Sequence, residues 1–138
     1  MSVPNEPEIQ AIYERARETR LNAYAPYSGF RVGAAARIVG TDTIVSACNV
    51  ENVSLGATVC AERNMIAAII AAYGRVEIEH LVVVSDYDPP VVPCALCLQV
   101  LQEFCPQTLA IHSADTAAVR NTLTLADLLP LPFKTFEE

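Results

Sequence analysis

Three of the five cysteines in this 138-residue chain stand where two predicted helices begin. Cys60 lies in the segment Thr58-Val59-Cys60-Ala61-Glu62-Arg63, and Cys94 and Cys97 lie in Pro93-Cys94-Ala95-Leu96-Cys97. At a helix N-terminus, the free N–H groups and the helix dipole favour a thiolate over a thiol. A fold that brings the two helix starts together would gather the three sulfurs at one point. No other feature of the sequence restricts the possible folds as strongly.

The pattern of apolar residues around these segments predicts an α/β domain with a mixed sheet. A continuous apolar run over 81–84, mostly β-branched, is typical of a central strand. The short connection Gly40-Thr41-Asp42 predicts a hairpin, so the first two strands should be antiparallel, and we expect the later strands to be parallel. The predicted elements are a helix over 8–24 that ends before Pro26, strands over 30–39 and 43–50, a helix over about 59–73 with Thr58 as its N-cap and Gly74 after its end, a strand over 80–85, a helix over 94–104, short strands over 109–111 and 119–123, and a last helical turn over 124–129.

Zinc suits this arrangement of cysteines. Cys94 and Cys97 are one helical turn apart and can hold one ion together, and Cys60 would reach it from the neighbouring helix. Three protein ligands leave the fourth position of a tetrahedral zinc site to water, which is the pattern of a catalytic site. Zinc lowers the pKa of that water, and Glu62 is close enough to move protons without being a ligand. A ligand-x-Glu segment followed by Pro-Cys-x-x-Cys is the signature of zinc deaminases, here with cysteine as the first ligand.

A lone Cys-x-x-Cys pair would carry little weight, because thioredoxin-like redox pairs and half zinc fingers share it. A redox protein predicts no zinc and a Cys94–Cys97 disulfide that forms readily. A non-catalytic zinc module predicts bound zinc and no reaction. Glu62 speaks against that module, since a structural site needs no carboxylate there.

Composition excludes several other classes. The formal charge is -7, and the nine basic residues are scattered, so we expect neither a nucleic-acid partner nor an acidic membrane surface. The first eight residues do not resemble a signal peptide, and the longest apolar stretch, 65–73, is too short to span a bilayer. Reduced thiols in the cytoplasm are therefore expected. The helix over 59–73 is mostly apolar and should be buried on more than one face. The hydrophobic fraction of 52% suggests a symmetric oligomer.

The chain resembles the homotetrameric zinc-dependent cytidine deaminases nearly from end to end. The matching blocks are Tyr27-Ser28-Gly29-Phe30-Arg31-Val32-Gly33-Ala34-Ala35, Cys48-Asn49-Val50-Glu51-Asn52, Thr58 to Arg63, Pro93-Cys94-x-x-Cys97-x-Gln99-Val100-Leu101-x-Glu103-Phe104 and Leu128-Leu129-Pro130-x-x-Phe133. The resemblance implies a single three-layer α/β/α domain over 1–138 with a mixed five-stranded sheet, a homotetramer and a small-molecule nucleoside substrate.

The resemblance also implies roles for individual residues. Cys60, Cys94 and Cys97 are the expected zinc ligands, and Glu62 is the expected catalytic proton carrier. Asn49 and Glu51 resemble the pair that hydrogen-bonds the ribose hydroxyls, and Phe30 the aromatic contact beside base and sugar. The backbone at Ala61 resembles the reader of the amino edge of the base, Arg63 a donor to the thiolates, and Phe133 the aromatic side chain lent to a neighbouring subunit. Taken from the residues alone, Asn49 and Glu51 are as readily a turn-capping amide and a solvated carboxylate.

Four positions depart from the family pattern. Leu98 stands where the family usually has arginine, Leu55 where many members have tyrosine, and Ala95 and Leu96 replace a smaller pair. The metal ligands and Glu62 are untouched. We therefore expect hydrolytic deamination of cytidine and 2′-deoxycytidine in pyrimidine salvage, with zinc as cofactor. The departures leave open a deaminase of a modified or antibiotic cytosine nucleoside.

Overall fold

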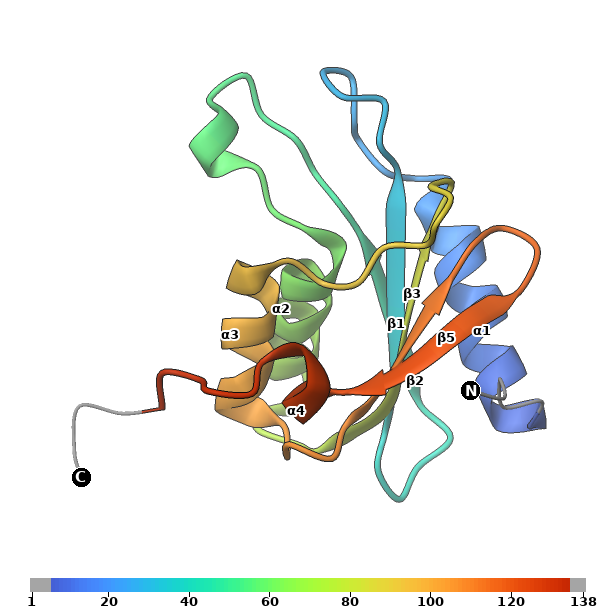
Figure 1. Ribbon diagram of the computed structural model, residues 1–138, viewed down its shortest axis with the longest axis vertical. Helices are drawn as coiled ribbons and strands as arrows, with labels where there is room; N and C mark the ends of the chain where they lie inside the picture. Colours follow the sequence, from blue (N-terminus) through green and yellow to red (C-terminus); the bar gives the residue numbers. More distant parts are fainter. Residues whose placement is uncertain (1–5, 135–138) are drawn as a thin grey trace.

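The computed structural model of the chain describes residues 6–134 and consists of three layers (Figure 1). Helix α1 covers one face of a five-stranded sheet, and α2 and α3 cover the other face, with α4 beside α3. The elements are α1 (Pro7–Arg20), β1 (Val32–Ile38), β2 (Ile44–Cys48), the 3-10 helix η1 (Leu55–Ala57), α2 (Ala61–Tyr73), β3 (Ile78–Ser85), α3 (Ala95–Phe104), β4 (Ala110–Ala114), β5 (Val119–Thr124) and α4 (Leu125–Leu128). The expected α/β class and the mixed five-stranded sheet are confirmed.

The strand order is β2-β1-β3-β4-β5. β1 pairs antiparallel with β2, as the hairpin predicted, and also with β3, while β3 and β4 are parallel. The expectation that all later strands are parallel is wrong for β5, which is antiparallel to β4. The reason lies in the short turn between them, where Asp115 Oδ1 accepts hydrogen bonds from the amides of Ala117 (2.8 Å) and Ala118 (2.9 Å). So short a turn makes a hairpin and cannot make the crossover that a parallel pair needs.

The two faces of the sheet bury alternate residues of the central strands. On β3, Leu81 and Val83 belong to the core beneath α2 and α3, whereas Val82 and Val84 belong to the core beneath α1. This alternation has the period of two that a strand imposes. Because helices cover both faces, β3 is apolar in both directions. That explains the unbroken apolar run in the sequence.

Helix α1 packs against the sheet through backbone contact at Gly33. A Cβ atom placed on Gly33 would lie 2.0 Å from the carbonyl oxygen of Ala16 and 2.9 Å from the amide nitrogen of Arg20. No side chain fits in that space, so a glycine is required there for the helix to lie as close as it does.

Two helix boundaries differ from the expected ones because long-range hydrogen bonds decide them. α1 ends at Arg20 and not at 24, since Tyr24 is drawn into a parallel bridge with Val50. α2 begins at Ala61 with Cys60 as its N-cap, and the expected N-cap, Thr58, instead follows the 3-10 helix. An antiparallel bridge between Val50 and Val59 keeps the chain extended up to Cys60.

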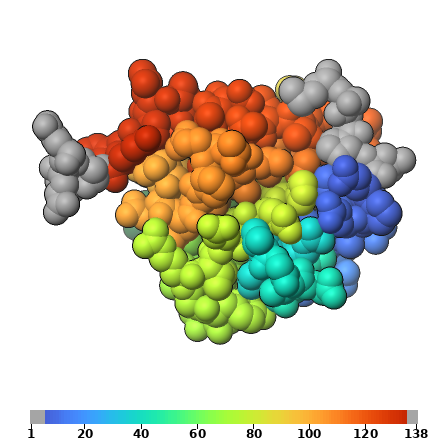
Figure 2. All heavy atoms as spheres, turned by 90° about the horizontal axis from the view of Figure 1, so that it is seen from below, coloured from blue at the N-terminus to red at the C-terminus, as the bar shows by residue number. Residues whose placement is uncertain are grey.

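Helices α2 and α3 lie side by side on the surface, as Figure 2 shows from below. One face of α2 is exposed in the single described chain, so the expectation that this helix is buried on more than one face stays a prediction. The exposed face comprises Ala67, Ala68, Ala71 and Ala72. In the part of the chain that the structure describes, every helix is too short or too polar to cross a membrane.

Candidate metal centre and its cleft

The starts of α2 and α3 bring three sulfurs together. Cys60 is the N-cap of α2, Cys94 is the N-cap of α3, and Cys97 follows in the first turn of α3. The Cys60 and Cys94 Sγ atoms are 3.9 Å apart, those of Cys94 and Cys97 are 3.6 Å apart, and all three lie within 4.8 Å of one another. The prediction that these cysteines meet at two neighbouring helix N-termini is confirmed.

The geometry of the sulfurs fits a tetrahedral zinc ion. With Zn–S bonds of about 2.3 Å, two sulfurs at corners of a tetrahedron lie about 3.8 Å apart. The separations of 3.9 Å and 3.6 Å are close to this value. Soft thiolate donors favour zinc, copper(I) or iron–sulfur centres over magnesium or calcium. Within the described residues, this is the one group of three or more cysteine, histidine or acidic side chains close enough to hold an ion.

Negative charge is stabilised at the sulfur of Cys60. Hydrogen bonds from Cys97 and then from Arg63 lower the pKa of Cys60 to about 5. Arg63 Nη2 donates to Cys60 Sγ over 3.5 Å, and this contact raises the pKa of Arg63. Cys97, which is buried and donates to Cys60, has a raised pKa. The cluster therefore holds a thiolate beside a fixed positive charge, as expected of Arg63.

Glu62 is buried next to these sulfurs. Its side chain belongs to the first turn of α2, and the residue is 4% exposed. Burial raises the pKa of Glu62 to about 7, and the negative charge of Cys60 adds to the effect. A carboxyl group whose pKa is close to neutral can both take up and release a proton at physiological pH.

A cleft of about 310 Å³ opens beside the sulfurs and Glu62. This volume is at the lower end of the range for small-molecule sites. All of the expected substrate contacts except Phe133 line it. The lining residues are Phe30, Val32, Asn49, Glu51, Thr58, Cys60, Ala61, Glu62, Val91, Val92 and Cys94.

Asn49 and Glu51 have structural contacts as well as a place in the cleft. Asn49 is buried; its Oδ1 accepts from the Val32 amide over 2.9 Å, and its Nδ2 donates to the Phe30 carbonyl over 2.7 Å. Glu51 Oε1 accepts from the amides of Tyr27 (2.9 Å) and Ser28 (3.1 Å), and Oε2 accepts from the Ser28 hydroxyl. The hydrogen bonds from Ser28 lower the pKa of Glu51. Each side chain keeps unused capacity, since an amide nitrogen has two donors and a carboxylate about four acceptor positions.

Phe133 lies outside this cleft. Its side chain is 60% exposed, and its carbonyl oxygen accepts from Gln99 Nε2 (2.6 Å) and Gln102 Nε2 (3.3 Å) of α3. The expectation that Phe133 enters the cleft of a neighbouring subunit stays a prediction. Among the departures from the family pattern, Leu55 and Leu96 are exposed, whereas Leu98 is buried in the core beneath α2 and α3.

Three polar contacts that the sequence did not reveal hold the cysteine segments in place. Asn64 Nδ2 donates to the carbonyls of Cys48 (2.9 Å) and Val59 (3.4 Å), which fixes the approach to Cys60. Ser113 Oγ, on β4, donates to the Val91 carbonyl over 2.7 Å, three residues before Cys94. The position of Asn64 one helical turn after Cys60 is a weak sequence signal for its contact. The contact of Ser113 has no local sequence signal, because its partner Val91 is far away along the chain.

Comparison with known proteins agrees with this arrangement over most of the chain. Residues 7–113 match the family described as the cytidine and deoxycytidylate deaminase zinc-binding region. The chain belongs to this family. Cytidine deaminase from Halalkalibacterium halodurans is 36% identical over 126 residues, which cover 90% of this chain and 92% of that protein. The cytidine deaminase of Mycobacterium tuberculosis is 40% identical over 121 residues, which cover 86% of this chain and 84% of that protein.

Solved structures of family members have the same fold. The crystal structure of cytidine deaminase from Burkholderia pseudomallei superimposes with a TM-score of 0.83 at 37% identity, covering 90% of this chain and 98% of that one. Cytidine deaminase from Mycobacterium tuberculosis gives a TM-score of 0.79 at 35% identity, over 94% of this chain and 100% of that one. The deaminase family resemblance therefore extends from sequence blocks to the whole architecture.

Proposed function

We propose that this chain is a zinc-dependent deaminase that hydrolyses cytidine and 2′-deoxycytidine to uridine and 2′-deoxyuridine with release of ammonia. The observation that carries the proposal is the meeting of three cysteine sulfurs within 4.8 Å beside a cleft that also holds the buried carboxyl of Glu62. The named activity of the relatives supports the choice of cytidine. Free nucleosides as substrates would place the reaction in pyrimidine salvage.

Cys60, Cys94 and Cys97 would hold the zinc ion, and Arg63 offsets part of the charge of three thiolates by donating to Cys60. When bound, zinc supplies Lewis-acid chemistry that makes water nucleophilic at neutral pH. Glu62 accepts one proton of the attacking water and passes it to N3 of the base. It then takes the remaining proton from the new hydroxyl group on C4 and gives it to the amine, which leaves as ammonia while the C4 carbonyl forms. Its pKa of about 7 suits both transfers. One water is consumed and one ammonia is released.

The remaining lining residues would orient the nucleoside. Phe30 contacts the base and sugar, the backbone of Ala61 hydrogen-bonds the amino edge of the base, and Asn49 and Glu51 use their remaining hydrogen-bonding capacity for the ribose hydroxyls. This placement puts the base beside the cysteines and the sugar beside the 27–30 segment. Truncating either ribose contact should raise KM more than it lowers kcat, because the contact is made equally in the ground and transition states.

The deciding experiment follows the ultraviolet absorbance of cytidine after addition of the zinc-loaded protein. We expect turnover with the wild type and a loss of about 10²- to 10⁴-fold in kcat with Glu62→Gln, the contribution of one positioned acid–base group. Zinc content should be equal in the two proteins, because Glu62 is not a ligand. Bound zinc without ammonia release from cytidine would favour the non-catalytic module. Faster turnover of other cytosine nucleosides would favour the specialised deaminase.

The ligand set is tested by removing one sulfur at a time. Cys97→Ala should lower the zinc content and abolish activity, whereas Cys105→Ala should retain one zinc per chain. Cys105 is the matched control because it is also a free cysteine of the same segment but packs against the core beneath α2 and α3, where burial raises its pKa to about 12. Absence of zinc from the reduced wild type, together with a Cys94–Cys97 disulfide, would support a redox protein instead.

The homotetramer remains a proposal that rests on exposed apolar surface. The alanine face of α2 is uncovered, and the exposed side chains near the cleft and the end of the chain include Val53, Leu55, Leu96, Leu131 and Phe133. Other copies of the chain would cover this surface. Sedimentation should give four chains, and a monodisperse monomer would contradict the proposal. The cytoplasmic location, inferred from thiols that must stay reduced to bind metal, likewise stays a prediction.

A further inference from the structure

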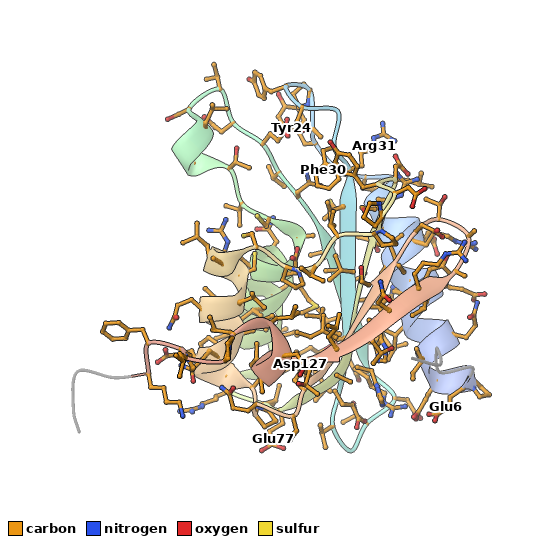
Figure 3. The ribbon with its side chains drawn as sticks, in the orientation of Figure 1. Glu6, Tyr24, Phe30, Arg31, Glu77 and Asp127 are labelled. Atoms are coloured by element: carbon orange, nitrogen blue, oxygen red, sulfur yellow. The ribbon has the colours of Figure 1, made fainter. Side chains whose placement is uncertain are left out.

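Phe30 forms a wall between two hollows. On one side is the cleft lined by Cys60, Cys94 and Glu62. On the other is a second hollow of about 240 Å³, lined by Ser28, Gly29, Phe30, Asp86 and Tyr87. Figure 3 shows Phe30 at the end of the sheet where β1 begins. The orientation of its ring therefore sets the shape of the cleft at the end that we assign to the sugar.

The backbone of Phe30 is fixed on both sides. Its amide donates to Ser28 Oγ over 3.0 Å, and Ser28 is itself bonded to Glu51. Its carbonyl accepts from Asn49 over 2.7 Å. These bonds hold the main chain but do not fix rotation about the Cα–Cβ bond. The ring packs against the core beneath α2 and α3 on one side, and on the side of the second hollow it needs a further contact to keep one orientation.

Tyr87 supplies that contact. The Phe30 and Tyr87 ring centroids are 4.8 Å apart with an angle of 57° between the planes, which is a favourable tilted geometry for an aromatic pair. Tyr87 is 58% exposed, so burial in the core does not explain its position. The segment that carries it is nevertheless anchored. The Tyr87 amide donates to Ser85 Oγ over 3.4 Å, and Asp86 forms an ion pair with Arg20 at 2.8 Å.

We infer that Tyr87 is a positioning residue that holds the Phe30 ring against the cleft and so sets the affinity for the nucleoside. This inference rests on the proposed function. It assigns Tyr87 no contact with the reacting atoms. Without the Tyr87 ring, Phe30 can turn into the second hollow, and the cleft loses its aromatic wall. An aromatic pair of this geometry corresponds to a factor of about two to twelve in an equilibrium constant.

The test compares Tyr87→Ala with Tyr87→Phe in steady-state kinetics on cytidine. Tyr87→Ala should raise KM by about two- to twelvefold and leave kcat within about twofold of the wild type. Tyr87→Phe, which retains the ring, should keep the wild-type KM. Tyr73→Ala is the matched control, because Tyr73 is another half-exposed tyrosine but lies at the end of α2 and lines neither hollow. Its KM should not change.

A double-mutant cycle shows whether Tyr87 acts through Phe30. In a Phe30→Ala background, Tyr87→Ala should have no further effect on KM, since the ring that it positions is gone. Additive effects would overturn the inference. So would a parallel loss of kcat and zinc content in Tyr87→Ala, which would indicate a general disturbance of the Cys94 segment. A wild type that does not deaminate cytidine would overturn the proposed function and this inference together, whereas an active wild type with a KM indifferent to Tyr87→Ala would overturn only the role of Tyr87.

Discussion

The buried histidine on the α1 side of the sheet should make the protein lose stability in weak acid. His112 is 1% exposed on β4; its Nε2 lies 3.2 Å from His80 Nδ1, and its Nδ1 lies 2.9 Å from Thr122 Oγ1. Burial lowers the pKa of His112 from 6.5 to about 4, and the neighbouring His80 adds to the effect. The other ring nitrogen of His80, Nε2, is 3.6 Å from Glu8 Oε1, and Arg37 binds the second carboxylate oxygen of Glu8.

The size and sign of the effect follow from proton linkage. Above pH 6.5, His112 is neutral in both the folded and the unfolded chain, so it contributes no pH dependence. Between pH 6.5 and about 4, the unfolded chain binds a proton at this position and the folded chain does not, so the free energy of unfolding falls as the pH falls. At about pH 4.5 the loss amounts to about 2–3 kcal/mol relative to pH 8, because each pH unit between the two pKa values lowers the free energy of unfolding by roughly 1 kcal/mol.

Urea unfolding of the wild type and His112→Gln at matched protein concentration measures this loss. The glutamine of the variant retains an amide that can hydrogen-bond but does not titrate, while the thiols and carboxylates are common to both proteins and cancel in the difference. The stability difference between wild type and variant should shift by about 2–3 kcal/mol in favour of the variant from pH 8 to pH 4.5. A difference that stays constant over that range would refute the reasoning.

Two further predictions concern packing and capping. Gly33→Ala should cost at least about 3 kcal/mol of stability in urea unfolding, because the new Cβ would lie 2.0 Å from the Ala16 carbonyl oxygen and overpacking usually costs about 1–3 kcal/mol. Gly56→Ala, where a Cβ meets nothing within 4 Å, should change stability by less than about 1 kcal/mol. Thr124→Ala should cost about 1 kcal/mol, because Thr124 and Asp127 form a complete capping box at the start of α4.

The sequence predicted the elements and the cysteines at two helix starts because both follow from local patterns; that these cysteines are zinc ligands stays a prediction. The alternation on β3 and the cysteines at two helix starts can be recognised within a few residues of the chain. The exact start of α2 could not be predicted, since the Val50–Val59 bridge that delays it joins segments whose pairing only the tertiary fold determines. The antiparallel direction of β5 could have been predicted from the sequence. Asp115 followed closely by a strand is a turn signal of the kind that predicts a hairpin.

The candidate site shows the same division between local and long-range information. The sequence blocks indicated that Asn49 and Glu51 lie near the cleft, and both line it. The polar atoms of Asn49 and Glu51 also hold Phe30 and Ser28 in place. These hydrogen bonds depend on the distance between two loops, and no spacing in the sequence encodes that distance. The Phe30–Tyr87 contact joins two segments that are far apart along the chain. Such contacts arise only once the sheet has set the ends of its strands side by side.

Metal removal should loosen the starts of α2 and α3 selectively, and the capping of the helices gives the reason. Cys60 and Cys94 are the N-caps of these helices, and neither side chain makes a capping hydrogen bond, whereas α4 has a full capping box. A bound ion would join the two uncapped ends through their own N-cap sulfurs, and the binding free energy then stabilises the folded ends. After chelation, amide hydrogen exchange should accelerate by about tenfold or more at 62–64 and 96–98, while the amide of Asp127 in α4 exchanges as before. Equal acceleration at all three helix starts would mean that the ion acts on global stability and not on these two N-caps.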